Sequence, residues 1–124
     1  MAITLVGLGG CSEKRSQPLA IDNSLTQEEI AAGVLSPEVM WKMGRVGLAS
    51  LSPDASRLLY TVTWYNMQEN RGVTAIYVRD AASGEVAQLT DFSSNNSDPK
   101  WNADGSKIYF PVSYTHLTLP TIRL

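Results

Sequence analysis

The chain has 124 residues, of which 44% are hydrophobic and 18% charged, so its length allows one small domain. A formal net charge of -2 gives no basic surface, which argues against nucleic acid as a partner. One Cys excludes an internal disulfide and a multi-cysteine zinc site, and one His leaves at most one conventional general base.

Residues 1–10 form an uncharged, apolar stretch that ends in small residues, and polarity rises abruptly after Cys11. This order is typical of the end of a secretory signal. The run L-G-G-C at residues 8–11 resembles a bacterial lipobox, in which the Cys becomes the new N-terminus and carries lipid on its thiol. We therefore predict that residues 1–10 are a signal remnant and that Cys11 is the lipid attachment site. The alternative is a buried first strand with an incidental Cys.

Residues 11–24 are polar, contain Pro18 and show no apolar period, so we predict a tether between the lipid and the domain. A lipid anchor makes the membrane a partner. It locates the protein in the cell envelope, in the periplasm or at the outer membrane.

Two capping signals open the folded part, within a helical lead-in that we assign to residues 25–46. Thr26 and Glu29 have the spacing of a capping box, in which each side chain bonds the backbone N–H of the other residue. Ser36 precedes Pro37, which predicts an N-cap followed by proline at the first helical position. The predicted helix stops are Gly33 and Gly44, and the predicted apolar stripe is Val39, Met40 and Met43.

From Gly47 the apolar period changes to two, which predicts β-strands. Residues 57–65, R-L-L-Y-T-V-T-W-Y, are rich in β-branched and aromatic residues. Alternation predicts two faces: Leu58, Tyr60, Val62 and Trp64 on one, and Leu59, Thr61, Thr63 and Tyr65 on the other. Further strands are predicted at 75–80, at 85–90 and from 107 to 110, with polar loops at 66–72 and 91–99.

Two turns of the same pattern stand 50 residues apart, at residues 52–57 and 102–107. In each, an Asp is followed by Ser, a basic residue and an apolar strand. Such an Asp bonds the backbone that follows it, and the next residue takes a left-handed conformation. Gly105 suits that conformation, whereas Ala55 should cost about 1 kcal/mol there. Such a period predicts β-propeller blades.

We therefore predict a mostly β fold: an incomplete β-propeller over residues 47–111, preceded by one or two short helices. A blade needs about 40–45 residues. The stretch thus holds about one and a half four-stranded antiparallel blades. Their open edges would leave the chain marginally stable or prone to aggregation alone.

Residues 112–124 break the preceding pattern. Residues 112–121 back-translate to GTC TCT TAT ACA CAT CTG ACG CTG CCG ACG A, which resembles the transposon end and adapter of fragmentation-based sequencing libraries. Residues 122–124 would then come from index bases. We predict a non-native tail, the alternative being a terminal strand with a Thr-rich turn. Because His116 lies in this tail, the natural part of the chain would have no imidazole.

The turn S-P-D-A-S-R at residues 52–57, the run I-Y-V-R-D-A-A-S-G-E at 76–85 and the Q-L-T that follows resemble the propeller repeats of TolB-like proteins. The run L-S-P-E-V-M-W-K-M-G-R-V-G at 35–47, with T-V-T-W-Y-N-M-Q-E-N at 61–70, is similar to the start of prolyl oligopeptidase family serine peptidases. The similarity is to the dipeptidyl- or acylaminoacyl-peptidase branch and covers about residues 25–110.

This resemblance implies an N-terminal propeller that gates a C-terminal α/β-hydrolase domain, whose Ser lies on a G-x-S-x-G elbow and is followed by Asp and His. No G-x-S-x-G occurs in the chain, so no catalytic residue is carried over. The resemblance implies the propeller portion of a secreted serine peptidase that hydrolyses peptides, inactive by itself. The alternatives are a TolB-like propeller binding lipoprotein of the envelope without a hydrolase domain, and a small standalone envelope lipoprotein.

Three further groups of side chains have a functional and a structural interpretation. Glu28 and Glu29 form an adjacent pair of the kind that holds a substrate amine in the family's dipeptidyl peptidases, but they lie in the capping box and precede the first blade. Six aromatics could form a carbohydrate or peptide platform, although strand spacing favours packing: Trp41, Tyr60, Trp64, Tyr65, Tyr77 and Trp101. Five polar residues could bind calcium, but their spacing fits no calcium loop: Asp91, Asn95, Asn96, Asp98 and Asp104. We therefore predict no catalytic, cofactor or metal site.

Overall fold

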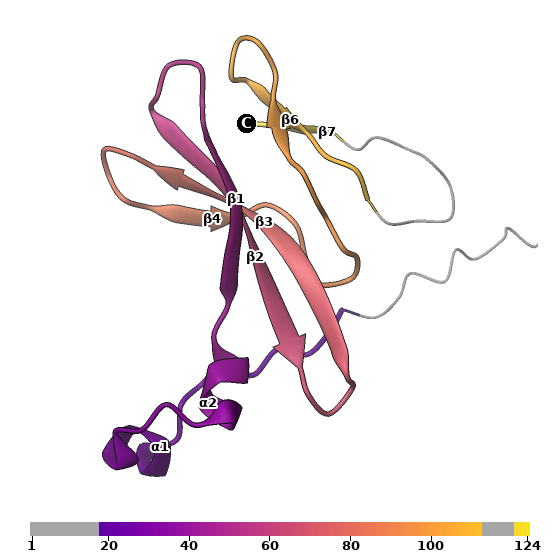
Figure 1. Cartoon of the computed structure of the whole chain (residues 1–124). Helices are drawn as coiled ribbons and strands as arrows, with labels where there is room; N and C mark the ends of the chain where they lie inside the picture. The colour runs from indigo at the N-terminus through magenta and orange to yellow at the C-terminus, as the bar shows by residue number, and fades with distance from the viewer. Residues whose placement is uncertain (1–17, 113–120) are drawn as a thin grey trace, which may run out of the picture.

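The computed structural model describes residues 18–112 and 121–124. It is mostly β, with a four-stranded and a three-stranded antiparallel sheet and two short helices at one end of the larger sheet (Figure 1). In chain order the elements are α1 (Gln27–Ala32), α2 (Pro37–Lys42), β1 (Arg45–Leu51), β2 (Arg57–Asn66), β3 (Arg71–Asp80), β4 (Val86–Gln88), β5 (Lys100–Trp101), β6 (Lys107–Tyr109) and β7 (Thr121–Arg123). The predicted fold class is confirmed, and one complete four-stranded sheet followed by the start of another fits a partial propeller.

Helix α1 begins and ends as its capping signals predict. The Oγ1 of Thr26 accepts a hydrogen bond from the Glu29 N–H at 3.2 Å, and Glu29 Oε2 accepts one from the Thr26 N–H at 2.8 Å. Gly33 ends the helix in the left-handed conformation, at φ 60°. The capping box thus satisfies two backbone donors that the helix itself cannot.

Helix α2 differs from its prediction at its C-terminus and on its apolar face. Met43 is the C-cap in place of Gly44. A Cβ on Gly44 would lie 2.6 Å from Val62 Cγ1, so this glycine permits the close approach of the chain to β2. The predicted apolar stripe is wrong in part, because α2 packs only on the end of the sheet. Val39 is buried, whereas Met40 and Met43 are half exposed.

The larger sheet is an antiparallel meander in the order β1-β2-β3-β4. Tyr60 stacks on Tyr77 and the Trp64 indole donates to the hydroxyl of the same Tyr77, whereas Leu59 is buried in the core, so the predicted alternation of β2 is confirmed. Strand β3 begins at Arg71, earlier than the sequence predicts, because β2 and β3 pair without a break as far as Asn66 opposite Arg71. Residues 66, 71 and 72 therefore belong to strands and not to the predicted polar loop at 66–72, because cross-strand pairing stabilises them there.

The core lies where the two sheets meet. Leu59 and Ile76 of the larger sheet form a buried cluster with Ile108 and Phe110, and Trp101 packs against its edge. The indole N–H of Trp101 also donates to the Ser50 carbonyl at 3.3 Å. Because these contacts join the larger sheet to residues of the second sheet, their burial holds the two sheets together.

The repeated turns have the same hydrogen bonds. In the first, Asp54 Oδ1 accepts from the Ser56 N–H at 3.1 Å; in the second, Asp104 Oδ1 accepts from the Ser106 N–H at 2.7 Å. The residue after each Asp is left-handed, with φ 56° at Ala55 and φ 73° at Gly105. The predicted left-handed alanine is therefore confirmed.

Two terminal segments pack onto this framework. Leu19 is buried and its N–H donates to the Phe92 carbonyl at 2.9 Å, so the last part of the predicted tether is attached to the domain. Strand β7 pairs with β6, with Ile122 opposite Ile108. That strand lies in the segment predicted to be non-native, whose origin stays a prediction.

Candidate functional site

The residues with the most obvious chemistry are not in the described part of the chain. Cys11, the predicted lipid attachment site, and His116, the sole imidazole, both fall within residues 1–17 or 113–120. Among residues 18–112 and 121–124, no group of three or more acidic, His or Cys side chains is placed to hold a metal ion.

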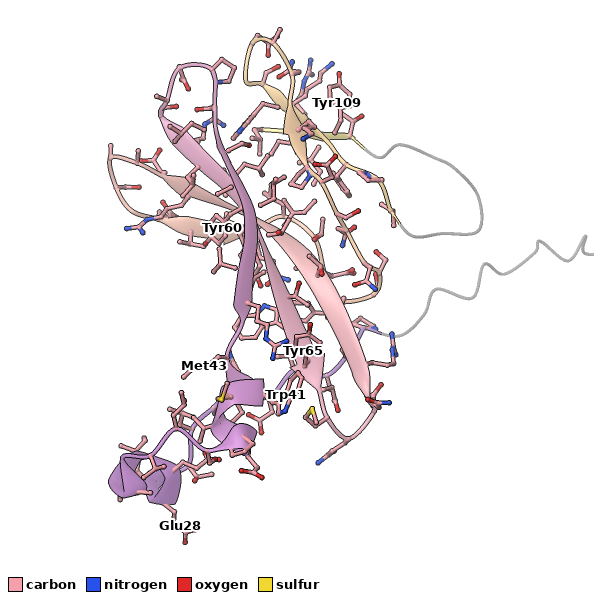
Figure 2. The ribbon with its side chains drawn as sticks, viewed as in Figure 1. Glu28, Trp41, Met43, Tyr60, Tyr65 and Tyr109 are labelled. Carbon is pink, nitrogen blue, oxygen red and sulfur yellow. The ribbon has the colours of Figure 1, made fainter. Side chains whose placement is uncertain are left out.

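The Glu28–Glu29 pair does not converge on a ligand. Glu29 closes the capping box and accepts a hydrogen bond from Lys42 Nζ at 2.8 Å. Lys42 holds the pKa of the Glu29 carboxyl below its usual value, helped by the Thr26 N–H. Glu28 lies on the exposed side of α1 (Figure 2). The pair therefore serves helix structure and an ion pair between α1 and α2.

The acidic and amide residues considered for calcium have separate structural partners. Asn95 Oδ1 accepts from the Thr74 N–H at 2.9 Å, and the buried Asn96 donates from its backbone N–H to the Thr74 carbonyl at 3.0 Å. Asp98 pairs with Lys100 at 2.9 Å. These bonds attach the loop after β4 to β3, in the place where a further strand would pair.

Five of the six predicted aromatic residues form two groups at different places. Tyr60 and Tyr77 stack on one face of the larger sheet, with ring centroids 5.7 Å apart, and the Trp64 indole donates to the Tyr77 hydroxyl at 3.1 Å. Trp41 of α2 and Tyr65 of β2 meet edge to face at 5.2 Å near the helical end of the sheet (Figure 2). The first group is cross-strand packing, whereas the second borders a pocket.

This pocket, of about 580 Å³, lies between the segment at 20–22, helix α2 and the end of the β2–β3 hairpin. Its lining is Ala20, Ile21, Asp22, Pro37, Glu38, Trp41, Lys42, Tyr65, Asn66, Met67 and Gln68. The amide of Asn66 donates to the Ala20 carbonyl at 2.8 Å and fixes the segment against the hairpin. We call this cavity the Trp41 pocket.

The Trp41 pocket has an aromatic side and a charged side. The Arg45 guanidinium lies 4.5 Å from the Trp41 ring centroid and 4.7 Å from that of Tyr65, within the range of a cation–π contact. On the charged side, the Ser24 hydroxyl and N–H hold the pKa of Asp22 below its usual value. Backbone N–H bonding likewise lowers the pKa of Glu38, so both carboxyls are ionised at neutral pH.

The sequence does not predict this pocket, because its walls come from segments up to 48 residues apart. The spacing of Tyr65 and Trp41 predicts packing, and the 20–22 segment lies within the predicted tether. The one local signal for the pocket is Trp41, an aromatic residue of α2 whose position the alternation of a strand does not explain. A pocket depends on tertiary placement, which no local pattern encodes.

Within the described residues, no helix has the length and apolar character needed to cross a membrane.

No protein-family model matches the chain, and no solved structure does. The chain is 32% identical over 90 residues to dipeptidyl-peptidase 5 of Porphyromonas endodontalis, and 32% identical over 76 residues to dipeptidyl-peptidase 5 of Porphyromonas gingivalis. These matches cover 72% and 61% of this chain but 13% and 11% of the relatives, so the chain spans about an eighth of their length. The chain is therefore similar to a part of a dipeptidyl peptidase.

Proposed function

We propose that this chain is the propeller portion of a secreted, lipid-anchored serine peptidase of the prolyl oligopeptidase family, and that by itself it does not hydrolyse peptides. The similarity to two dipeptidyl-peptidase 5 proteins carries the proposal. The mostly β fold, with one complete antiparallel sheet and the start of a second, supports it.

In this proposal the chain shapes the route by which peptide substrates reach a hydrolase domain encoded further along the gene. An activated serine needs a base and an orienting carboxylate within hydrogen-bond reach. The chain has no G-x-S-x-G elbow, and its sole His lies in the segment predicted to be non-native. Bond cleavage is therefore assigned to the hydrolase domain, and substrate access to the propeller.

The test compares two purified proteins on a panel of chromogenic dipeptidyl substrates. We expect no turnover above buffer by the 124-residue chain. We expect turnover by the product of the uninterrupted gene, abolished when the elbow Ser is changed to Ala. Turnover by the 124-residue chain would contradict the claim that this chain by itself does not hydrolyse peptides. A long product that is inert on the whole panel would favour the binding lipoprotein.

We also propose that Cys11 carries a lipid that anchors the protein in the cell envelope, in the periplasm or at the outer membrane. The L-G-G-C run at 8–11 supports this. Cells that express the gene from its native start and grow with radiolabelled palmitate should label the protein. Cys11→Ala should lose the label, whereas Ser12→Ala should keep it. Equal labelling of both variants would contradict the anchor.

A further inference from the structure

The Trp41 pocket has the size and the fixed walls of a ligand site. Its volume of about 580 Å³ lies within the range of roughly 300–1,000 Å³ that is usual for small-molecule pockets. The Asn66 amide bonds the Ala20 carbonyl at 2.8 Å, and Lys42 Nζ bonds the Ser24 carbonyl at 3.0 Å. Both bonds attach the N-terminal segment to the rest of the fold, so the cavity exists before any ligand binds.

The charges that line the pocket do not cancel. Lys42 is the one basic residue of the lining, and its ammonium is already paired with Glu29 at 2.8 Å. Among the described residues, neither Asp22 nor Glu38 forms an ion pair. The charge of Lys42 also acts on Asp22, but the lining has two carboxylates and one ammonium group. It therefore has one net negative charge and should attract a cation.

The aromatic side of the pocket favours the same kind of ligand. Trp41 and Tyr65 both line the cavity, whereas Arg45, which contacts both rings, is not part of the lining. These rings thus already hold one cation by their π faces, and they offer apolar surface to a second group. Because Glu29 neutralises Lys42, the two carboxylates of Asp22 and Glu38 exceed the single positive charge of Arg45 by one.

We propose that the Trp41 pocket binds a small organic ammonium ion with an apolar body. The ammonium group would lie toward Asp22 and Glu38, and the apolar body would pack on Trp41 and Tyr65. Every one of these residues belongs to the described chain, so the proposal does not depend on a hydrolase domain and can fail or succeed separately from the proposed function.

The test uses the full ¹⁵N-labelled chain and three probes of nearly the same shape: phenethylammonium, 2-phenylethanol and 3-phenylpropionate. The indole N–H resonance of Trp41 is assigned by its loss in Trp41→Phe. We expect a saturable shift of this resonance with phenethylammonium, a much weaker response with the alcohol and none with the carboxylate. Equal shifts with all three probes, or none with phenethylammonium, would overturn the proposal.

A pair of charge variants tests the role of the carboxylates. Asp22→Asn with Glu38→Gln should weaken phenethylammonium binding about three- to tenfold, as expected for two exposed ion pairs. Glu28→Gln with Glu85→Gln removes the same net charge at exposed positions outside the pocket and should change affinity less than twofold. An equal loss in both double variants would assign the effect to long-range charge and refute the site. The dispersion of the same spectra reports whether each variant is folded.

Discussion

Replacing Ala55 by glycine removes a methyl group from a residue that the first repeated turn holds at φ 56°. The left-handed conformation costs a residue with a Cβ about 1–2 kcal/mol. Glycine also makes the unfolded chain more flexible, which lowers the free energy of unfolding by about 0.5–1 kcal/mol and offsets part of this gain. Ala55 is exposed, so no packing is lost. We expect a net stabilisation of roughly 0.5–1 kcal/mol.

The equivalent change in the second turn should have the opposite sign. Gly105 has φ 73°, and a Cβ built there would lie 3.2 Å from Pro53 Cδ of the first turn. Gly105→Ala therefore adds both backbone strain and crowding where the two turns touch. We expect a loss of about 1–3 kcal/mol.

Urea denaturation followed by far-UV circular dichroism measures both variants against the parent chain. Thermal melts should agree, with Ala55→Gly raising Tm by about 2–6 °C. A less stable Ala55→Gly, or a Gly105→Ala variant as stable as the parent, would refute the claim that both turns are left-handed after their Asp. One variant adds a glycine and the other removes one, so each is the control for the other. Comparing them separates the effect of turn conformation on stability from a general effect of glycine content.

Three further predictions use the same denaturation assay. The Ser52 and Ser56 hydroxyls lower the pKa of Asp54 to about 2, from 3.8, so the stability that Asp54 contributes should be complete above about pH 4 and be lost as pH falls toward 2. In Asp54→Asn the free energy of unfolding should therefore fall less between about pH 4 and pH 2 than in the parent chain. The same fall in both proteins would contradict this prediction. Ile108→Ala should lower the free energy of unfolding by about 2–5 kcal/mol, because the Ile108 side chain is 0% exposed. Val86 is half exposed, so Val86→Ala should lower it by less than about 0.5 kcal/mol. Equal losses would contradict the assignment of Ile108 to the core. Tyr77→Phe removes the acceptor of the Trp64 indole and should cost about 0.5–1.5 kcal/mol, whereas Tyr60→Phe, which keeps that bond and the stacked ring, should cost less.

Local signals in the sequence predicted the parts of the fold that depend on local chemistry. The capping box at Thr26 and the left-handed Ala55 each involve residues within a few positions of one another, so the sequence alone specifies them. The alternating faces of β2 follow from the pleat of a strand.

Features set by distant partners could not be predicted in this way. Strand β3 begins at Arg71 because β2 pairs along its whole length. Met40 and Met43 stay half exposed because α2 meets only the end of the sheet. The Trp41 pocket needs the Ala20 carbonyl beside Asn66, 46 residues away, and no local pattern predicts that contact.

We propose that this chain is the propeller part of a peptidase, and the sharpest test is continuous long-read sequencing of the source gene past the codon for Phe110. We expect the natural reading frame to depart from the sequence of residues 112–124. Beyond that point we expect further repeats with the same Asp-containing turns and, several hundred codons on, a G-x-S-x-G elbow followed by Asp and His. A frame that continues through residues 112–124 to a stop codon, or one that encodes more repeats and ends without an elbow, would contradict it.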